Sequence, residues 1–68
     1  MRERLRELCA ARGIDFAKAS KHAAGPVRHK DAVSAKVEAV EALALFEAGD
    51  RLQVVRCLSA LNDVERLA

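Results

Sequence analysis

The chain has 68 residues, enough for one domain at most, and 51% of them are hydrophobic, so a disordered chain is not expected. The net charge is +2, and neither of the two cysteines stands in a C-x-x-C pair, which argues against a mini-protein held together by disulfides or zinc. Residues 1–68 are therefore predicted to form a single small helical domain with a thin core of Leu and Val.

The N-terminus is charged rather than apolar, and the uncharged runs are too short to cross a bilayer. We therefore expect a cytoplasmic protein with reduced thiols and no membrane contact.

Isolated glycines and one Gly-Pro pair divide the chain into four segments, each with the composition of a helix. The first two helices are expected at about residues 2–12 and 16–24. Between them, Gly13 suits the left-handed position that ends many helices, and Ile14 suits the next position of a Schellman motif. Asp15 is then a good N-cap for the second helix.

The third helix, expected at about residues 28–48, has apolar residues on two nearly opposite sides. A surface helix has only one such side, so we expect this helix to be central and covered on both sides. We expect the valine side to pack on the fourth helix. The valine side consists of Val33, Val37, Val40 and Ala44, with Leu43 at its edge, and the alanine side consists of Ala32, Ala35, Ala39, Ala42 and Phe46.

The fourth helix, expected at about residues 51–67, has one clear apolar stripe, and Asp50 with Gln53 resembles a capping box at its start. The connection before it is so short that the third and fourth helices should form an antiparallel hairpin. The predicted fold is all-α, with three or four short helices and a hairpin formed by the last two. The stripe consists of Val54, Cys57, Leu58, Leu61, Val64 and Ala68.

No residue pattern indicates a catalytic, cofactor or metal site. His22 and His29 lie on either side of a Gly-Pro break, and Cys9 and Cys57 fall on apolar stripes, where a thiol keeps its proton. No serine stands in a Gly-x-Ser-x-Gly motif, and the isolated glycines form no phosphate-binding loop. We therefore expect a protein that is not an enzyme and that uses no cofactor, metal or small-molecule substrate.

Apolar surface that a short chain cannot cover predicts a protein–protein interaction module, that is, a small regulator, adaptor or inhibitor that works as a homodimer or with another protein. This prediction depends on a third helix that is covered on both sides. A peripheral third helix with one flank in water, on a self-sufficient molecule, would remove its basis. The expected surface lies on the hairpin, with Phe46, Leu52, Val55 and Leu58 at its centre and Glu38, Glu41, Arg51 and Arg56 at its rim.

The charge distribution leaves a DNA-binding regulator open as an alternative. Residues 1–36 contain nine Lys or Arg against four Asp or Glu, whereas residues 37–68 contain three against six. Lys18 and Lys21 on the second helix, with Arg28 and Lys30 at the start of the third, would form a basic patch in a helix-turn-helix-like unit. The helix that would read the bases turns acidic at Glu38, however, and it carries no Asn or Gln for that purpose.

Overall fold

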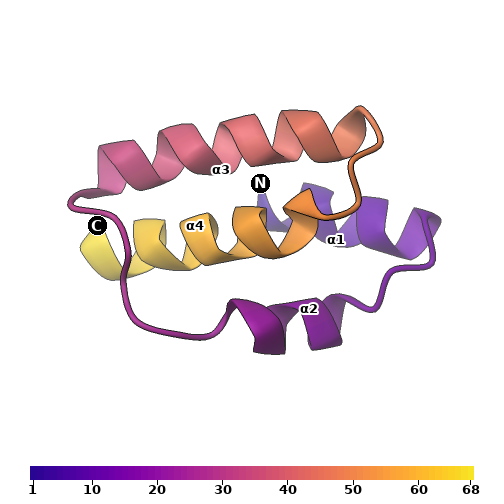
Figure 1. The fold of residues 1–68 in the computed structure, drawn as a ribbon, viewed down its shortest axis with the longest axis horizontal. Helices are drawn as coiled ribbons and strands as arrows, with labels where there is room; N and C mark the ends of the chain where they lie inside the picture. Colours follow the sequence, from indigo (N-terminus) through magenta and orange to yellow (C-terminus); the bar gives the residue numbers. More distant parts are fainter.

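The computed structural model describes residues 1–68 and contains four helices and no strands. They are α1 (Arg2–Ala11), α2 (Phe16–Ala23), α3 (Ala32–Glu47) and α4 (Gln53–Leu67). Figure 1 shows α3 and α4 running side by side in opposite directions. The predicted all-α fold and its antiparallel hairpin are therefore confirmed. None of the helices combines the length and the apolar composition that crossing a membrane would require.

Two glycines in the left-handed region end α1 and α3. Gly13 has φ +68° and Gly49 has φ +119°, which L side chains rarely adopt. After α1, the Ile14 N–H donates to the Cys9 carbonyl at 2.9 Å and the Gly13 N–H donates to the Ala10 carbonyl at 3.4 Å. This pair of bonds is the Schellman motif expected there.

Aspartate side chains begin α2 and α3. The Asp15 carboxylate accepts the Lys18 N–H at 3.1 Å, as expected of an N-cap. The Asp31 carboxylate accepts the Ser34 N–H at 2.7 Å, so α3 begins at Ala32 rather than near residue 28. Residues 28–31 belong to the connection between α2 and α3 instead.

The start of α4 differs in detail from the expected capping box. Asp50 accepts the Leu52 N–H at 3.1 Å and the Gln53 side-chain amide at 3.0 Å. These bonds close a turn, and the helix begins only at Gln53.

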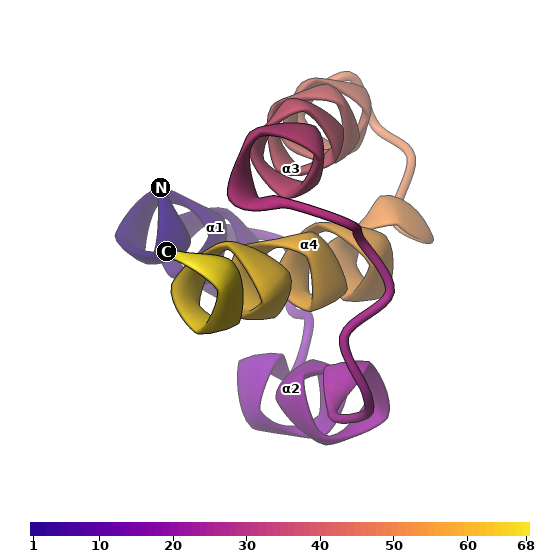
Figure 2. The same cartoon turned by 90° about the vertical axis from the view of Figure 1, so that its left-hand side faces the viewer.

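The central helix is α4 and not α3. In Figure 2, α4 lies between α3 and α2, with α1 alongside it. Helix α3 lies at the edge of the molecule and turns its valine side to water: Val33, Val37 and Val40 are 74%, 54% and 49% exposed. Both the prediction of a central third helix and the prediction that its valine side packs on the fourth helix are therefore wrong.

The alanine side of α3 packs on α4 because it allows a close approach and buries the larger side chain. Ala35, Ala39 and Ala42 are fully buried, and the Cys57 thiol on α4 reaches the Ala39 carbonyl at 3.5 Å. Helix separation depends on the side chains at the contact, and branched valines would hold the two backbones further apart. The same side carries Phe46, which supplies more apolar area than any valine.

Phe46 occupies the centre of the core, where α1, α3 and α4 meet. It is fully buried, as are Leu5, Leu58, Cys9 and Cys57. The Arg12 guanidinium lies 4.8 Å from the centre of the Phe46 ring and donates to the Phe46 carbonyl at 2.5 Å. Arg12 therefore joins the end of α1 to the carbonyl end of α3, a favourable place for a cation.

Candidate protein-interaction surface

Two of the residues expected at the centre of the interface belong to the core. Phe46 is 0% exposed and Leu58 is 1% exposed, so neither can contact a partner in this structure. Phe46 lies on the alanine side of α3, which is the buried side. Leu58 lies next to Cys57 on the central helix and is enclosed with it. The predicted surface therefore loses these two residues.

The other two apolar residues lie at the start of α4 and are accessible. Leu52 is 86% exposed, more than any other large hydrophobic residue. Val55 is partly buried and lines two cavities of about 490 Å³ and 340 Å³. One is lined by Arg28, His29, Glu38, Leu52, Val55, Arg56 and Ser59, and the other by Gly13, Ile14, Asp15, Lys18, Ala19, His22, Arg51 and Val55. Since both include Val55, they adjoin one another across α4.

The predicted charged rim residues on α3 and α4 contact one another. Arg56 Nε donates to Glu38 Oε1 at 2.9 Å, and its Nη2 lies 3.6 Å from Glu41 Oε2. Arg51 is exposed and donates to the Arg12 carbonyl at 3.3 Å, but it forms no ion pair. Arg56 and Glu38 line the larger cavity, whereas Arg51 lines the smaller one.

A second charged cluster, which the sequence analysis missed, is centred on His29. Nδ1 of His29 lies 2.7 Å from Asp63 Oδ2, and Nε2 contacts the Glu38 carboxylate. The Asp63 carboxylate is buried and also accepts the backbone N–H groups of Arg28 at 2.9 Å and of His29 at 3.2 Å. The feature of the sequence that points to this cluster is Asp63. It lies three residues after Ala60, on the buried side of α4, and a buried carboxylate needs a polar partner.

The contacts of this cluster shift the pKa values of all three side chains. The hydrogen bond to Asp63, with further support from Glu38, raises the pKa of His29 above its ordinary 6.5. The hydrogen bond from His29 and those from the backbone lower the pKa of Asp63, and the hydrogen bond from Arg56 lowers the pKa of Glu38. These contacts therefore favour the protonated form of His29, which bridges two carboxylates.

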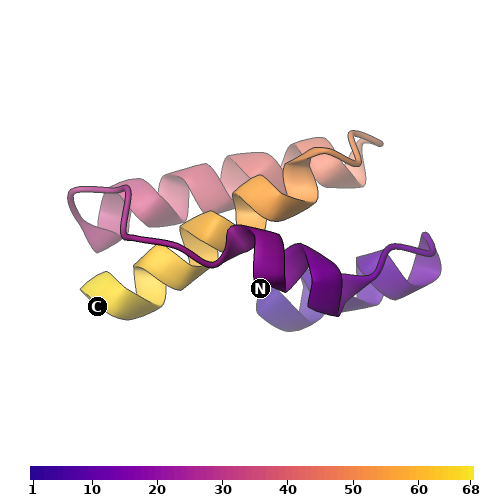
Figure 3. The ribbon, with the colours of Figure 1, turned by 60° about the horizontal axis from the view of Figure 1, so that its bottom comes forward.

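This bridge secures the connection between α2 and α3 along α4. Figure 3 shows α2 and the connection crossing over α4 to reach the start of α3. Besides Asp63, the Ser59 hydroxyl donates to the Ala23 carbonyl at 3.5 Å and the Arg66 guanidinium donates to the Gly25 carbonyl. The connection forms one wall of the larger cavity, and these bonds hold that wall in place.

The residues proposed for nucleic-acid binding are all exposed but do not gather in one place. Lys18 lines the smaller cavity and Arg28 the larger one, whereas Lys21 and Lys30 line neither. The start of a helix can bind a phosphate through its backbone N–H groups, but at α3 the carboxylate of Asp31 caps that end. The outer side of α3 is apolar, so this helix does not have the polar side chains of a recognition helix.

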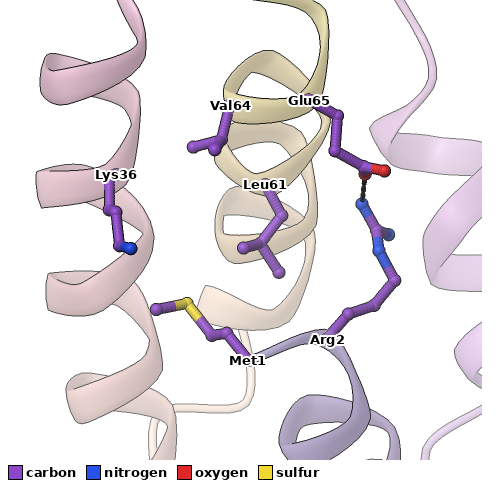
Figure 4. Close-up of a pocket in the computed structure, with 6 residues that line it drawn as sticks. All are labelled: Met1, Arg2, Lys36, Leu61, Val64 and Glu65. Atoms are coloured by element: carbon purple, nitrogen blue, oxygen red, sulfur yellow. Dashed lines mark hydrogen bonds and ion pairs between the residues drawn. The ribbon is translucent and has the colours of Figure 1, made fainter. Parts of the chain in front are cut away.

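A third cavity, of about 340 Å³, lies between α3, α4 and the first residues of the chain (Figure 4). Met1, Leu61 and Val64 supply its apolar lining, and Lys36 stands at its edge on α3. The remaining polar lining is the ion pair of Arg2 with Glu65, and the Lys36 side chain has no carboxylate partner.

Neither the thiols nor the histidine cluster is arranged for catalysis or metal binding. Burial raises the pKa of the Cys57 thiol to about 11 and also raises that of Cys9, so both stay protonated at neutral pH. The two ring nitrogens of His29 face different carboxylates, so neither is free to act as a base. No group of His, Cys, Asp and Glu residues converges on a point where a metal ion could sit.

Comparison with known proteins adds nothing that identifies the chain. The function therefore has to be inferred from the accessible side chains at the start of α4 and on the outer side of α3. No protein-family model, curated protein or solved structure matches this sequence.

Proposed function

We propose that the chain is a non-enzymatic protein-interaction module that binds a partner through the start of α4. The binding surface consists of Lys18, Arg28, Arg51, Leu52, Val55 and Arg56, and we refer to it as the Leu52 surface. The observation that carries the proposal is the 86% exposure of Leu52 beside two adjoining cavities. Covering a side chain of this size contributes about 1.5–3 kcal/mol to an association.

The folded chain does not need a partner to cover its core. Its solvent-accessible surface area is 4298 Å², close to the value of about 4,200 Å² expected for a compact monomer of 7.4 kDa. With α3 at the edge and one flank in water, the original reason for a binding module is lost. What supports the proposal now is the particular apolar side chain that the folded chain leaves in water.

The charges around Leu52 favour a partner segment that is both acidic and apolar. Lys18, Arg28 and Arg51 form no ion pair within the chain. The acidic residues of the two cavities are already engaged: Asp15 caps α2, and Glu38 pairs with Arg56 and His29. A helix with one apolar side and carboxylates along its edges would complement this surface.

Duplex DNA is the less favoured partner. An exposed leucine gives a phosphate backbone nothing to bind, and the four basic residues expected to contact DNA do not gather in one place. We also propose a cytoplasmic location, because both cysteines are free thiols in the core rather than parts of a bridge.

The test uses a displayed library of random peptides of helical length, selected against the purified chain. We expect selection of sequences rich in Asp and Glu with at least one large apolar residue. In a fluorescence titration, Leu52→Asp should weaken the binding of such a peptide at least tenfold. Val33→Asp is the matched control, because it places the same charge on another highly exposed apolar site, 74% exposed, on another face.

Three outcomes would overturn the proposal. One is a selection that yields no peptide, and another is binding that Leu52→Asp leaves unchanged while the variant keeps its helical circular dichroism. The third is tight binding of duplex DNA at low salt that Arg28→Glu removes, which would favour the DNA-binding alternative instead.

A further inference from the structure

The outer side of α3 is a second exposed apolar surface, separate from the Leu52 surface. It consists of Val33, Val37, Val40 and Ala44, which we call the valine stripe, and all four residues are exposed. Val33 alone is 74% exposed. Leaving three branched side chains in water on one side of a 16-residue helix forfeits stabilisation that another apolar surface would supply.

The spacing of the stripe is that of a two-stranded helical pair. Its residues are separated by four, three and four positions, so they alternate between the two core positions of a seven-residue repeat. Val37 and Ala44 take the first core position, and Val33 and Val40 take the second.

The two flanks of the stripe carry opposite charges. Lys36 lies on one flank and forms no ion pair, although it is exposed. Glu41 lies on the other flank, and its side chain is 63% exposed, with Arg56 Nη2 at 3.6 Å from its Oε2. In the repeat these are the two positions that form ion pairs between helices.

We propose that a second copy of this chain covers the valine stripe, in a parallel pair of α3 helices related by a twofold axis. In a parallel pair, Lys36 of each subunit faces Glu41 of the other, which gives two symmetric ion pairs. In an antiparallel pair each flank meets the same flank of the other subunit, so no opposite charges would meet. The charge pattern therefore selects the second copy and also its direction.

The contact is a small one. A 16-residue helix is about 24 Å long, and a single pair of such helices buries less than the roughly 1,200 Å² of a standard interface. The dimer is therefore expected to be weak and to depend on concentration. It leaves the Leu52 surface free, because Leu52 and Val55 lie on α4 and its preceding turn.

Cysteine cross-linking tests the direction of the pair. Val33→Cys lies at one end of the stripe, and in a parallel pair it meets its own copy, so oxidation should link two chains. In an antiparallel pair the same cysteine would meet position 44, and only a mixture with Ala44→Cys would form the link. The unchanged chain is the control, because its own cysteines are both fully buried.

Charge reversal tests the ion pairs in the parent chain by sedimentation. Lys36→Glu and Glu41→Lys should each weaken the dimer several-fold, and the double variant should restore it. Lys21→Glu, an exposed reversal on α2, is the matched control and should change nothing. Leu52→Asp should also leave the dimer intact, which separates this test from that of the proposed function.

The proposal is overturned by any of three results. They are a mass that stays at one chain at millimolar concentration, a cross-link that forms only in the mixture, and a double reversal that binds no better than the single ones.

Discussion

His29 and Asp63 are 34 residues apart in the chain, yet Nδ1 of His29 lies 2.7 Å from the Asp63 carboxylate. The contact joins the connection before α3 to the central helix. Because Asp63 is buried and also accepts two backbone N–H groups of the connection, its loss would remove three of the bonds that hold that segment. The bridge is therefore both a structural bond and a titratable one.

The free energy of unfolding should depend on pH through this bridge. The pKa of His29 is raised in the folded chain, so its contribution is complete below about 6.5 and is lost as the pH rises through the raised value. The pKa values of Asp63 and Glu38 are lowered from 3.8 and 4.5, so their contributions are complete above those values and are lost as the pH falls. Urea titrations across the pH range should show greatest stability between these limits. In His29→Gln the decline on the alkaline side should be absent, and an equally steep decline there would contradict the assignment.

Replacement of Asp63 should show how much the connection depends on it. Asp63→Ala leaves the N–H groups of Arg28 and His29 without their acceptor and should cost about 1–3 kcal/mol of unfolding free energy. Asp63→Asn keeps one acceptor oxygen and should cost less. Urea unfolding of the two variants makes the comparison, and equal stability of Asp63→Ala and the parent would show that the bonds do not matter.

Phe46 and Leu52 should respond in opposite ways to truncation. Phe46→Ala empties the centre of the core and should cost about 3–5 kcal/mol, enough to unfold most of so small a domain. Leu52→Ala removes an exposed side chain and should change stability by no more than about 0.5 kcal/mol. Thermal unfolding followed by circular dichroism would measure both. A large loss in Leu52→Ala would mean that Leu52 is needed for folding rather than for binding.

Two glycines with similar open surroundings should differ because of backbone conformation alone. A methyl group would meet nothing within 4 Å at either Gly13 or Gly25, but only Gly13 has a positive φ, of +68°. Gly13→Ala should therefore lose about 1–2 kcal/mol, whereas Gly25→Ala should be neutral or slightly stabilising. Chemical denaturation of the two variants tests this. Equal losses of stability would show that the positive φ of Gly13 is not the cause.

The sequence by itself determined the helices and most of their ends. Gly13 ends α1, and Asp15 begins α2, because these are local effects between neighbours in the chain that residue type alone reveals. The short turn before α4 was sufficient to predict the hairpin. The start of α3 was misplaced because the connection before it is held by Asp63, and no local pattern reports a partner so far along the chain.

Only the tertiary structure decided which side of α3 is buried, which residues of the hairpin remain accessible and where His29 lies. Both sides of α3 are apolar, so periodicity could not choose between them. The alanine side is the buried one, because its small residues let α4 approach closely and its Phe46 fills the core. That packing removed Phe46 and Leu58 from the surface, exposed the valine stripe, and left Leu52 in water. The physical reason is that hydrophobicity sets the tendency of a residue to be buried, whereas the shape of its neighbours decides which of the candidates are buried together.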